Sequence, residues 1–180
     1  LIHGQSQPWM YDVLALTLEI VGRPKEEIER ALLSRVDFTA EDVPSMLYAA
    51  AYLKRFGADR QAIVMYRQAS RLAPTRPEPY VLALYLAPRL ADYGALSWSS
   101  AGILTYVWGK EHRQFHRQAE DAVAEAADDL REAGRPEAAA ALEASLAEAK
   151  KRDVVLKLSW AGAGDLDLRV EEPSGSVCSY

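Results

Sequence analysis

The sequence predicts a mainly α-helical protein built from antiparallel helix pairs, with a short β-hairpin at its C-terminal end. Three observations lead to this fold class. Apolar residues recur at helical intervals from residue 8 to about residue 152, and short segments with Gly or Pro interrupt them. Residues 43–76 have the length of a helix–turn–helix repeat unit. At Asp153 the apolar period changes from about 3.6 to 2. We therefore expect a helical domain over residues 8–152 and a β segment over residues 153–180.

The composition is that of an ordinary globular protein, with 49% hydrophobic and 26% charged residues. A net charge of −5 disfavours nucleic-acid binding, which needs a clustered basic surface. No apolar run approaches the ~20 residues of a membrane span. The single Cys178 excludes an internal disulfide framework. Because the chain starts at Leu1 without a signal-peptide pattern, we expect a fragment or a processed product.

The first helix pair is expected between Pro8 and Val36. Residues 8–21 form its first helix, in which four apolar residues recur at helical intervals: Trp9, Val13, Leu16 and Ile20. Residues 22–24 (Gly-Arg-Pro) stop this helix, and Pro24 suits the first turn of the second one.

The central repeat begins after Thr39, which is expected to be the N-cap of its first helix, with Asp42 three residues later. Small residues occupy the positions where its two helices would cross, a large residue follows one turn later, and Gly57 marks the turn. These residues are Ala49, Ala50 and Leu53 in the first helix and Ala62, Tyr66, Ala69 and Pro74 in the second. Since small side chains let helices approach closely, we expect Ala50 and Ala62 to be deeply buried.

This spacing resembles the tetratricopeptide repeat (TPR) family, whose second helix follows the pattern A-x3-F-x2-A-x4-P. The resemblance is closest over residues 43–76 and extends loosely to the flanking helix pairs. It implies an α-solenoid whose first helices line a concave groove for extended peptides or helices. The residues expected to line this groove are Leu47, Ala51, Lys54 and Arg55 from the central repeat, and Val81, Tyr85 and Arg89 from the next repeat.

The resemblance also bears on the ligand of the groove. TPR proteins that bind chaperone tails hold a C-terminal carboxylate with Lys and Asn at such places, where this chain has Leu47 and Ala51. An apolar floor with Lys54, Arg55 and Arg89 at one rim favours a peptide with apolar anchors and some acidic character.

A third helix pair is expected after Pro77. Pro88 should kink or end its first helix because proline removes a hydrogen bond. The second helix is expected over residues 95–108. Most aromatic residues at helical spacing in the repeats are expected to pack between helices: Tyr48, Tyr52, Tyr66, Tyr80, Tyr85 and Trp98.

Residues 110–133 and 136–152 are expected to form the last helix pair, joined at Gly134. Their apolar stripes are narrow and rich in alanine, with charged residues elsewhere: Ala119, Val123, Ala126 and Leu130, then Ala139, Leu142, Leu146 and Ala149. This pattern is typical of a close-packed terminal unit with a polar outer face.

The C-terminal segment alternates apolar and polar residues over 154–160 and 166–170, and a third strand is expected from Val177 to Tyr180. An isolated hairpin is marginally stable, so either it packs on the helices or it begins a larger β-domain. The second alternative is favoured. Residues 165–175 (DLDLRVEEPSG) resemble the opening strands of β-sandwich modules of some bacterial extracytoplasmic proteins, which slightly favours that location.

Two sets of residues are candidates for a metal site. His112 and His116 are four apart on an expected helix, with Glu120 on the same face, but Arg113 and Arg117 lie between and beside them. A solvated polar face is therefore expected instead of a metal site. Asp165 and Asp167 share a strand face, and two carboxylates supply fewer oxygen ligands than calcium needs.

No catalytic pattern is found in the sequence. Cys178 has no positioned His or Asn partner, the serines at 97, 99 and 100 lie outside any nucleophile elbow, and Gly-rich phosphate loops are absent. The expected function is therefore a non-enzymatic module, without a cofactor, that binds a protein or peptide segment. The alternative is a structural spacer that positions a downstream β-domain, and an enzyme ranks third.

Overall fold

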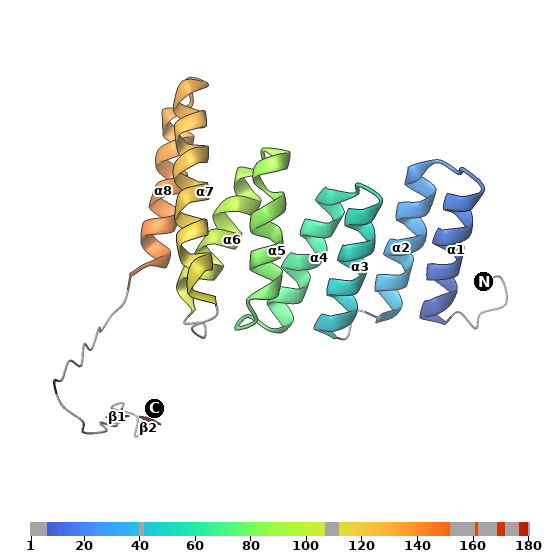
Figure 1. Ribbon diagram of the computed structural model, residues 1–180, viewed down its shortest axis with the longest axis horizontal. Helices are drawn as coiled ribbons and strands as arrows, with labels where there is room; N and C mark the ends of the chain where they lie inside the picture. Colours follow the sequence, from blue (N-terminus) through green and yellow to red (C-terminus); the bar gives the residue numbers. More distant parts are fainter. Residues whose placement is uncertain are drawn as a thin grey trace.

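The computed structural model describes residues 7–39, 42–106, 112–151, 161, 169–171 and 177–179. The described part is mainly α-helical, as the sequence predicts, and its helices stand side by side in chain order (Figure 1). Helices that follow one another in the chain pack against each other. The α-helices are α1 (Pro8–Ile20), α2 (Lys25–Thr39), α3 (Val43–Arg55), α4 (Asp59–Leu72), α5 (Glu78–Leu86), α6 (Tyr93–Thr105), α7 (Arg113–Glu132) and α8 (Pro136–Ala149), and a 3-10 helix, η1 (Pro88–Leu90), follows α5.

The same turn ends the first helix in three of the pairs. A glycine with positive φ stands in each turn: Gly22 (68°), Gly57 (71°) and Gly134 (72°). The next backbone N–H donates to a carbonyl five residues earlier: Arg23 to Leu18 at 2.9 Å, Ala58 to Leu53 at 2.8 Å and Arg135 to Leu130 at 2.8 Å. This is the Schellman pattern, which favours glycine because other residues are strained at positive φ.

Ala91 takes the equivalent place in the turn between α5 and α6, with a φ of 49°. The backbone N–H of Asp92 donates to Ala87 O at 3.0 Å, again five residues earlier. Gly22, Gly57 and Ala91 are 35 and 34 residues apart, so the first three pairs share nearly one repeat length. The predicted effect of Pro88 is confirmed, since α5 ends at Leu86 and η1 begins at Pro88.

Asp42, and not Thr39, is the N-cap of α3. Asp42 has an extended backbone, and its Oδ1 accepts a hydrogen bond from Ser45 N at 2.7 Å. Thr39 is the last residue of α2, so the predicted N-cap was wrong. The Asp42 carboxylate suits the start of α3, because it accepts a hydrogen bond from a backbone N–H that has no partner within the helix and lies at the positive end of the helix. Pro44 suits the first turn of a helix.

The core of the central pair matches the expected spacing. Ala50 and Ala62 are both 0% exposed, which confirms their predicted burial, and Tyr66 is 2% exposed. In α1 the apolar stripe predicted from the sequence is not the buried side of the helix. Helix α1 turns Ala15, which is 1% exposed, toward the core. The four stripe residues are exposed: Trp9 by 60%, Val13 by 52%, Leu16 by 48% and Ile20 by 75%.

The third helix pair closes around the ring of Tyr80. This ring lies against Trp98 and Tyr106, with centroid distances of 5.4 and 6.4 Å, and its hydroxyl donates to Pro74 O at 3.0 Å. A Cβ atom on Gly102 would lie 2.2 Å from two carbons of the ring. The crossing of α5 and α6 therefore depends on glycine at this position. Helix α6 ends at Thr105, earlier than the predicted residue 108, because Tyr106 is extended.

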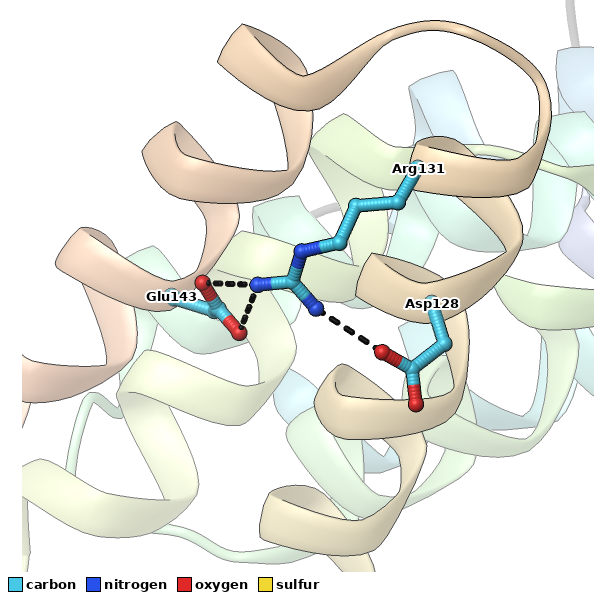
Figure 2. A network of polar contacts seen from close by, with 3 residues as sticks. All are labelled: Asp128, Arg131 and Glu143. Atoms are coloured by element: carbon cyan, nitrogen blue, oxygen red, sulfur yellow. Dashed lines mark hydrogen bonds and ion pairs between the residues drawn. The ribbon is translucent and has the colours of Figure 1, made fainter.

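The last helix pair has the expected alanine-rich seam. Ala119 and Ala139 are 0% exposed, and Leu130 is 1% exposed. On the surface of this pair, Arg131 Nη2 donates to both carboxylate oxygens of Glu143 at 2.6 Å, and Nη1 donates to Asp128 Oδ1 at 2.8 Å (Figure 2). These hydrogen bonds raise the pKa of Arg131 and join α7 to α8. Because the groups are exposed, their contribution to stability is small.

Two short strands are described after the helices: β1 (Arg169–Glu171) and β2 (Val177–Ser179). They pair antiparallel, with Val170 opposite Cys178. They fall in the second and third predicted strands, and the first predicted strand lies outside the described residues. The hairpin over residues 153–180 and its membership of a β-sandwich therefore stay predictions.

Candidate functional site

Five of the seven residues predicted to line a groove are exposed: Ala51, Lys54, Arg55, Tyr85 and Arg89. Leu47 is half-buried and packs against the core, and Val81 is buried. Lys54 and Arg55 end α3, and Arg89 lies in η1 beside the equivalent turn. Five of the seven predicted residues thus lie on the surface, and the other two belong to the packing beneath it.

The shared turn allows the first helices to be compared position by position. Residues nine, six and two positions before the turn residue lie at i, i+3 and i+7, which puts them on one side of α1, α3 and α7. In the third pair the same positions belong to α5 and, beyond its end, to η1. We call this set the first-helix face. Its members are Val13, Leu16 and Ile20 in α1; Tyr48, Ala51 and Arg55 in α3; Leu82 and Tyr85 in α5, with Arg89 in η1; and Glu125, Asp128 and Glu132 in α7. All are exposed except Leu82, which is half-buried.

The chemistry of the first-helix face changes along the row. Its α1 residues are all aliphatic, α3 and the α5–η1 segment each combine a tyrosine with an arginine, and its α7 residues are all acidic. Along the row from α1 to α7, the first-helix face is therefore first apolar, then aromatic and basic, then acidic.

Tyr85 is the most prominent aromatic residue of the middle section. Its side chain is 52% exposed, and its hydroxyl donates to Gln118 Oε1 of α7 at 3.0 Å. Gln118 also lines an open pocket on α7 with Gln114, Arg117 and Asp121. Tyr85 thus offers a ring face next to polar side chains that can donate and accept hydrogen bonds.

Tyr48 was not among the predicted groove residues, although it belongs to the same face. It is 46% exposed, and its ring centroid is 4.9 Å from that of Tyr52. Its hydroxyl donates to the Tyr52 hydroxyl at 3.1 Å. Tyr48 stands three residues before Ala51 on the same helix, so the helical spacing that placed Ala51 in the groove could have predicted Tyr48 as well. The prediction that most of these aromatics pack between helices holds for Tyr66 and Tyr80, which are buried, and for Tyr52 and Trp98, which are half-buried against the core. It does not hold for Tyr48 and Tyr85, which are exposed.

Arg55 lies toward α1. Its Nη2 is 4.0 Å from Glu19 Oε2, and its guanidinium carbon lies 5.8 Å from the ring centroid of Phe56. A small pocket between α1 and α3 of about 130 Å³ includes Arg55, Glu19 and Phe56 in its lining. Both members of the ion pair are exposed, so the pair is weak and leaves Arg55 open to other anions.

Val81 lines a separate small pocket between α5 and α7, of about 190 Å³. The other lining residues are Pro77, Glu78, Leu82, His112 and Phe115. Hydrogen bonds from Arg76 hold the pKa of the Glu78 carboxyl below its ordinary value. This pocket is mostly apolar with one anion and does not suit an acidic ligand.

His112 precedes α7 and His116 lies in its first turn. Within the described residues, no three side chains of His, Cys, Asp or Glu are grouped to hold a metal. Asp165 and Asp167 lie outside those residues, and the side chain of Cys178 is not described.

We expect the purified protein to contain no stoichiometric zinc at His112 and His116, because two imidazoles beside Arg117 are a poor site for a cation. Metal analysis of protein purified without a metal-affinity step tests this. One zinc per chain that disappears in His116→Ala would contradict the expectation.

No protein-family model matches the chain, and no curated protein matches it by sequence. Among the described residues, no helix combines the length and the apolar character needed to cross a membrane.

Proposed function

We propose that the protein is a TPR-like α-solenoid that binds a peptide or protein segment without catalysing a reaction. The observation that carries the proposal is the half-exposed ring of Tyr85 on the first-helix face, with Arg89 on the same face. Large exposed aromatics beside cations are the residue types that dominate binding energy at interfaces. The repeat length shared by the first three turns supports the solenoid part of the proposal.

The chemistry of the first-helix face supports a ligand with both apolar and acidic groups. Tyr48 and Tyr85 offer apolar contact, and Arg55 and Arg89 occupy equivalent positions of neighbouring pairs, where they can attract carboxylates. Glu125, Asp128 and Glu132 on α7 would repel a uniformly acidic segment. The acidic groups of the ligand are therefore expected opposite α3 and α5, and neutral or basic groups opposite α7.

A structural spacer is the second candidate function. It is favoured by the paired strands β1 and β2 that follow the helices, because the helices could serve to position a β-domain. A spacer does not require the exposed aromatic residues of the first-helix face to contact anything.

The two candidates are separated by selecting binders from a displayed library of random peptides and measuring affinity by fluorescence anisotropy. We expect the selected peptides to combine apolar residues with Asp or Glu. Tyr85→Ala should weaken binding by about 30-fold or more, because a desolvated aromatic anchor contributes most of the energy. Arg55→Ser with Arg89→Ser should weaken binding less and reduce its dependence on salt.

Matched controls come from the second helix of the central pair. Leu72 is as exposed as Tyr85, at 52%, so Leu72→Ala tests the loss of a similarly exposed apolar side chain elsewhere. Arg60→Ser with Arg71→Ser removes the same charge from α4. Melting temperatures should be nearly equal for all these variants. If no peptide is selected, or if the controls weaken binding as much as Tyr85→Ala does, the spacer function is the better account.

A further inference from the structure

Helices α5 and α7 meet at two successive levels beside Tyr85. At the first level the Tyr85 hydroxyl donates a hydrogen bond to Gln118 Oε1 at 3.0 Å. Three residues earlier on each helix, Leu82 and Phe115 line the pocket between the two helices, which we call the α5–α7 pocket. Residues three apart on a helix are neighbours on its surface. Because Tyr85 and Leu82 both belong to the first-helix face, the pocket adjoins the aromatic and basic section of that face.

The size of the α5–α7 pocket suits one ring-shaped group. Its volume is about 190 Å³, and it is open to solvent. Most of its lining is apolar and comes from Pro77, Val81, Leu82 and Phe115. For comparison, a dry cavity of about 150 Å³ lined by apolar side chains binds benzene. The α5–α7 pocket is therefore large enough for one aromatic side chain and too small for a whole helix.

The charges at the pocket favour a neutral occupant. Glu78 supplies the one carboxylate among the described lining residues. Arg76 donates to that carboxylate from Nε at 3.2 Å and also from Nη2, so the negative charge already has a partner. A cation would gain little from a carboxylate that is already paired, and an anion would be repelled by it. A neutral aromatic ring gains by leaving water for apolar walls.

We propose that the α5–α7 pocket holds an aromatic side chain of the bound segment, next to the contact with Tyr85. This inference rests on the proposed function, because it requires a segment that lies on the first-helix face. It adds a sequence order to the ligand. The acidic groups lie opposite α3 and α5, the aromatic group lies between α5 and α7, and neutral or basic groups follow opposite α7.

The first test uses peptides selected from the random library, with affinities measured by fluorescence anisotropy. Most of these peptides should carry Phe, Tyr or Trp next to their acidic part. Replacing that residue of a selected peptide with Ala should weaken binding by about 10-fold. Leu82→Trp fills the pocket from its own wall and should cause a similar loss for the parent peptide. It should cause little further loss for the Ala peptide, because both changes remove the same contact.

Leu72→Trp is the matched control, because it adds the same side chain at a position on α4 that is 52% exposed. It should leave the affinities of both peptides unchanged. The second test needs no change in the protein, so it does not depend on how Leu82→Trp folds. A photoactivatable phenylalanine analogue replaces the aromatic residue of the peptide, and mass spectrometry locates the crosslink. Crosslinks are expected at Val81, Leu82 or Phe115.

The outcomes separate this inference from the proposed function. Peptides whose binding requires Tyr85 but does not weaken when their aromatic residue becomes Ala overturn the inference and leave the proposed function standing. Crosslinks only outside the pocket have the same meaning. A further 10-fold loss when Leu82→Trp is combined with the Ala peptide, or an equal loss with Leu72→Trp, also overturns it. If the library yields no peptide, the proposed function and this inference fall together.

Discussion

Gly102→Ala is expected to destabilise the protein by about 1–3 kcal/mol, although alanine favours helices more than glycine does. The reason is that the new methyl group would lie 2.2 Å from the ring of Tyr80. This ring has little room to move, because Trp98 and Tyr106 lie beside it and its hydroxyl is bound to Pro74 O. The free energy of unfolding in urea measures the effect.

Gly94→Ala is the matched control, since Gly94 lies in the same helix and its new Cβ would only reach an ordinary contact of 3.5 Å with Asp92 Oδ1. We expect this control to be neutral or slightly stabilising. In a Tyr80→Leu background the cost of Gly102→Ala should largely disappear, as the large group is gone. If Gly102→Ala is as stable as Gly94→Ala, Tyr80 does not occupy the position described.

Ala62→Leu is expected to cost about 1–3 kcal/mol, because Ala62 is 0% exposed at the crossing of α3 and α4 and three extra carbon atoms cannot be accommodated there. The unfolding midpoint in urea should fall with little change in the slope of the transition.

Ala140→Leu provides the comparison for this substitution. Ala140 is exposed on α8, so the same change in volume meets solvent and should alter the free energy of unfolding by less than about 0.5 kcal/mol. An unchanged midpoint for Ala62→Leu would remove the helix register on which the TPR resemblance depends.

The sequence was sufficient to locate the helix pairs because their signals are local. Gly57 and Pro88 act through their own backbone preferences, and Ala50 and Ala62 act through size at a fixed spacing. None of these effects depends on distant contacts, and the structure places all four residues as expected. The β segment is less accessible to this reasoning, because an alternating pattern predicts a strand without saying which strand pairs with it.

The surface was harder to predict than the core. Helical spacing identifies a stripe but not the element that covers it, so the stripe containing Val13 looked the same as a buried one. Aromatic residues are ambiguous for the same reason, since they suit both a core and an interface: Tyr48 and Tyr85 are exposed, although their helical spacing is like that of buried Tyr66 and Tyr80. The N-cap of α3 is ambiguous in the sequence because threonine and aspartate are both good caps, and only the extended backbone of Asp42 decides between Thr39 and Asp42.

The recurrent turn after each first helix also has a consequence for how the chain folds. Its hydrogen bonds span no more than five residues, and the helices it joins pack mainly on their neighbours, so no long loop has to close before structure forms. Folding can then start in any pair and spread along the row. Helix α6 contacts both α7 and α8, whereas the first pair contacts the following helices mainly through the packing of α2 on α3. The first pair should therefore be the one that opens most readily, and Tyr80 lies in the part that opens last.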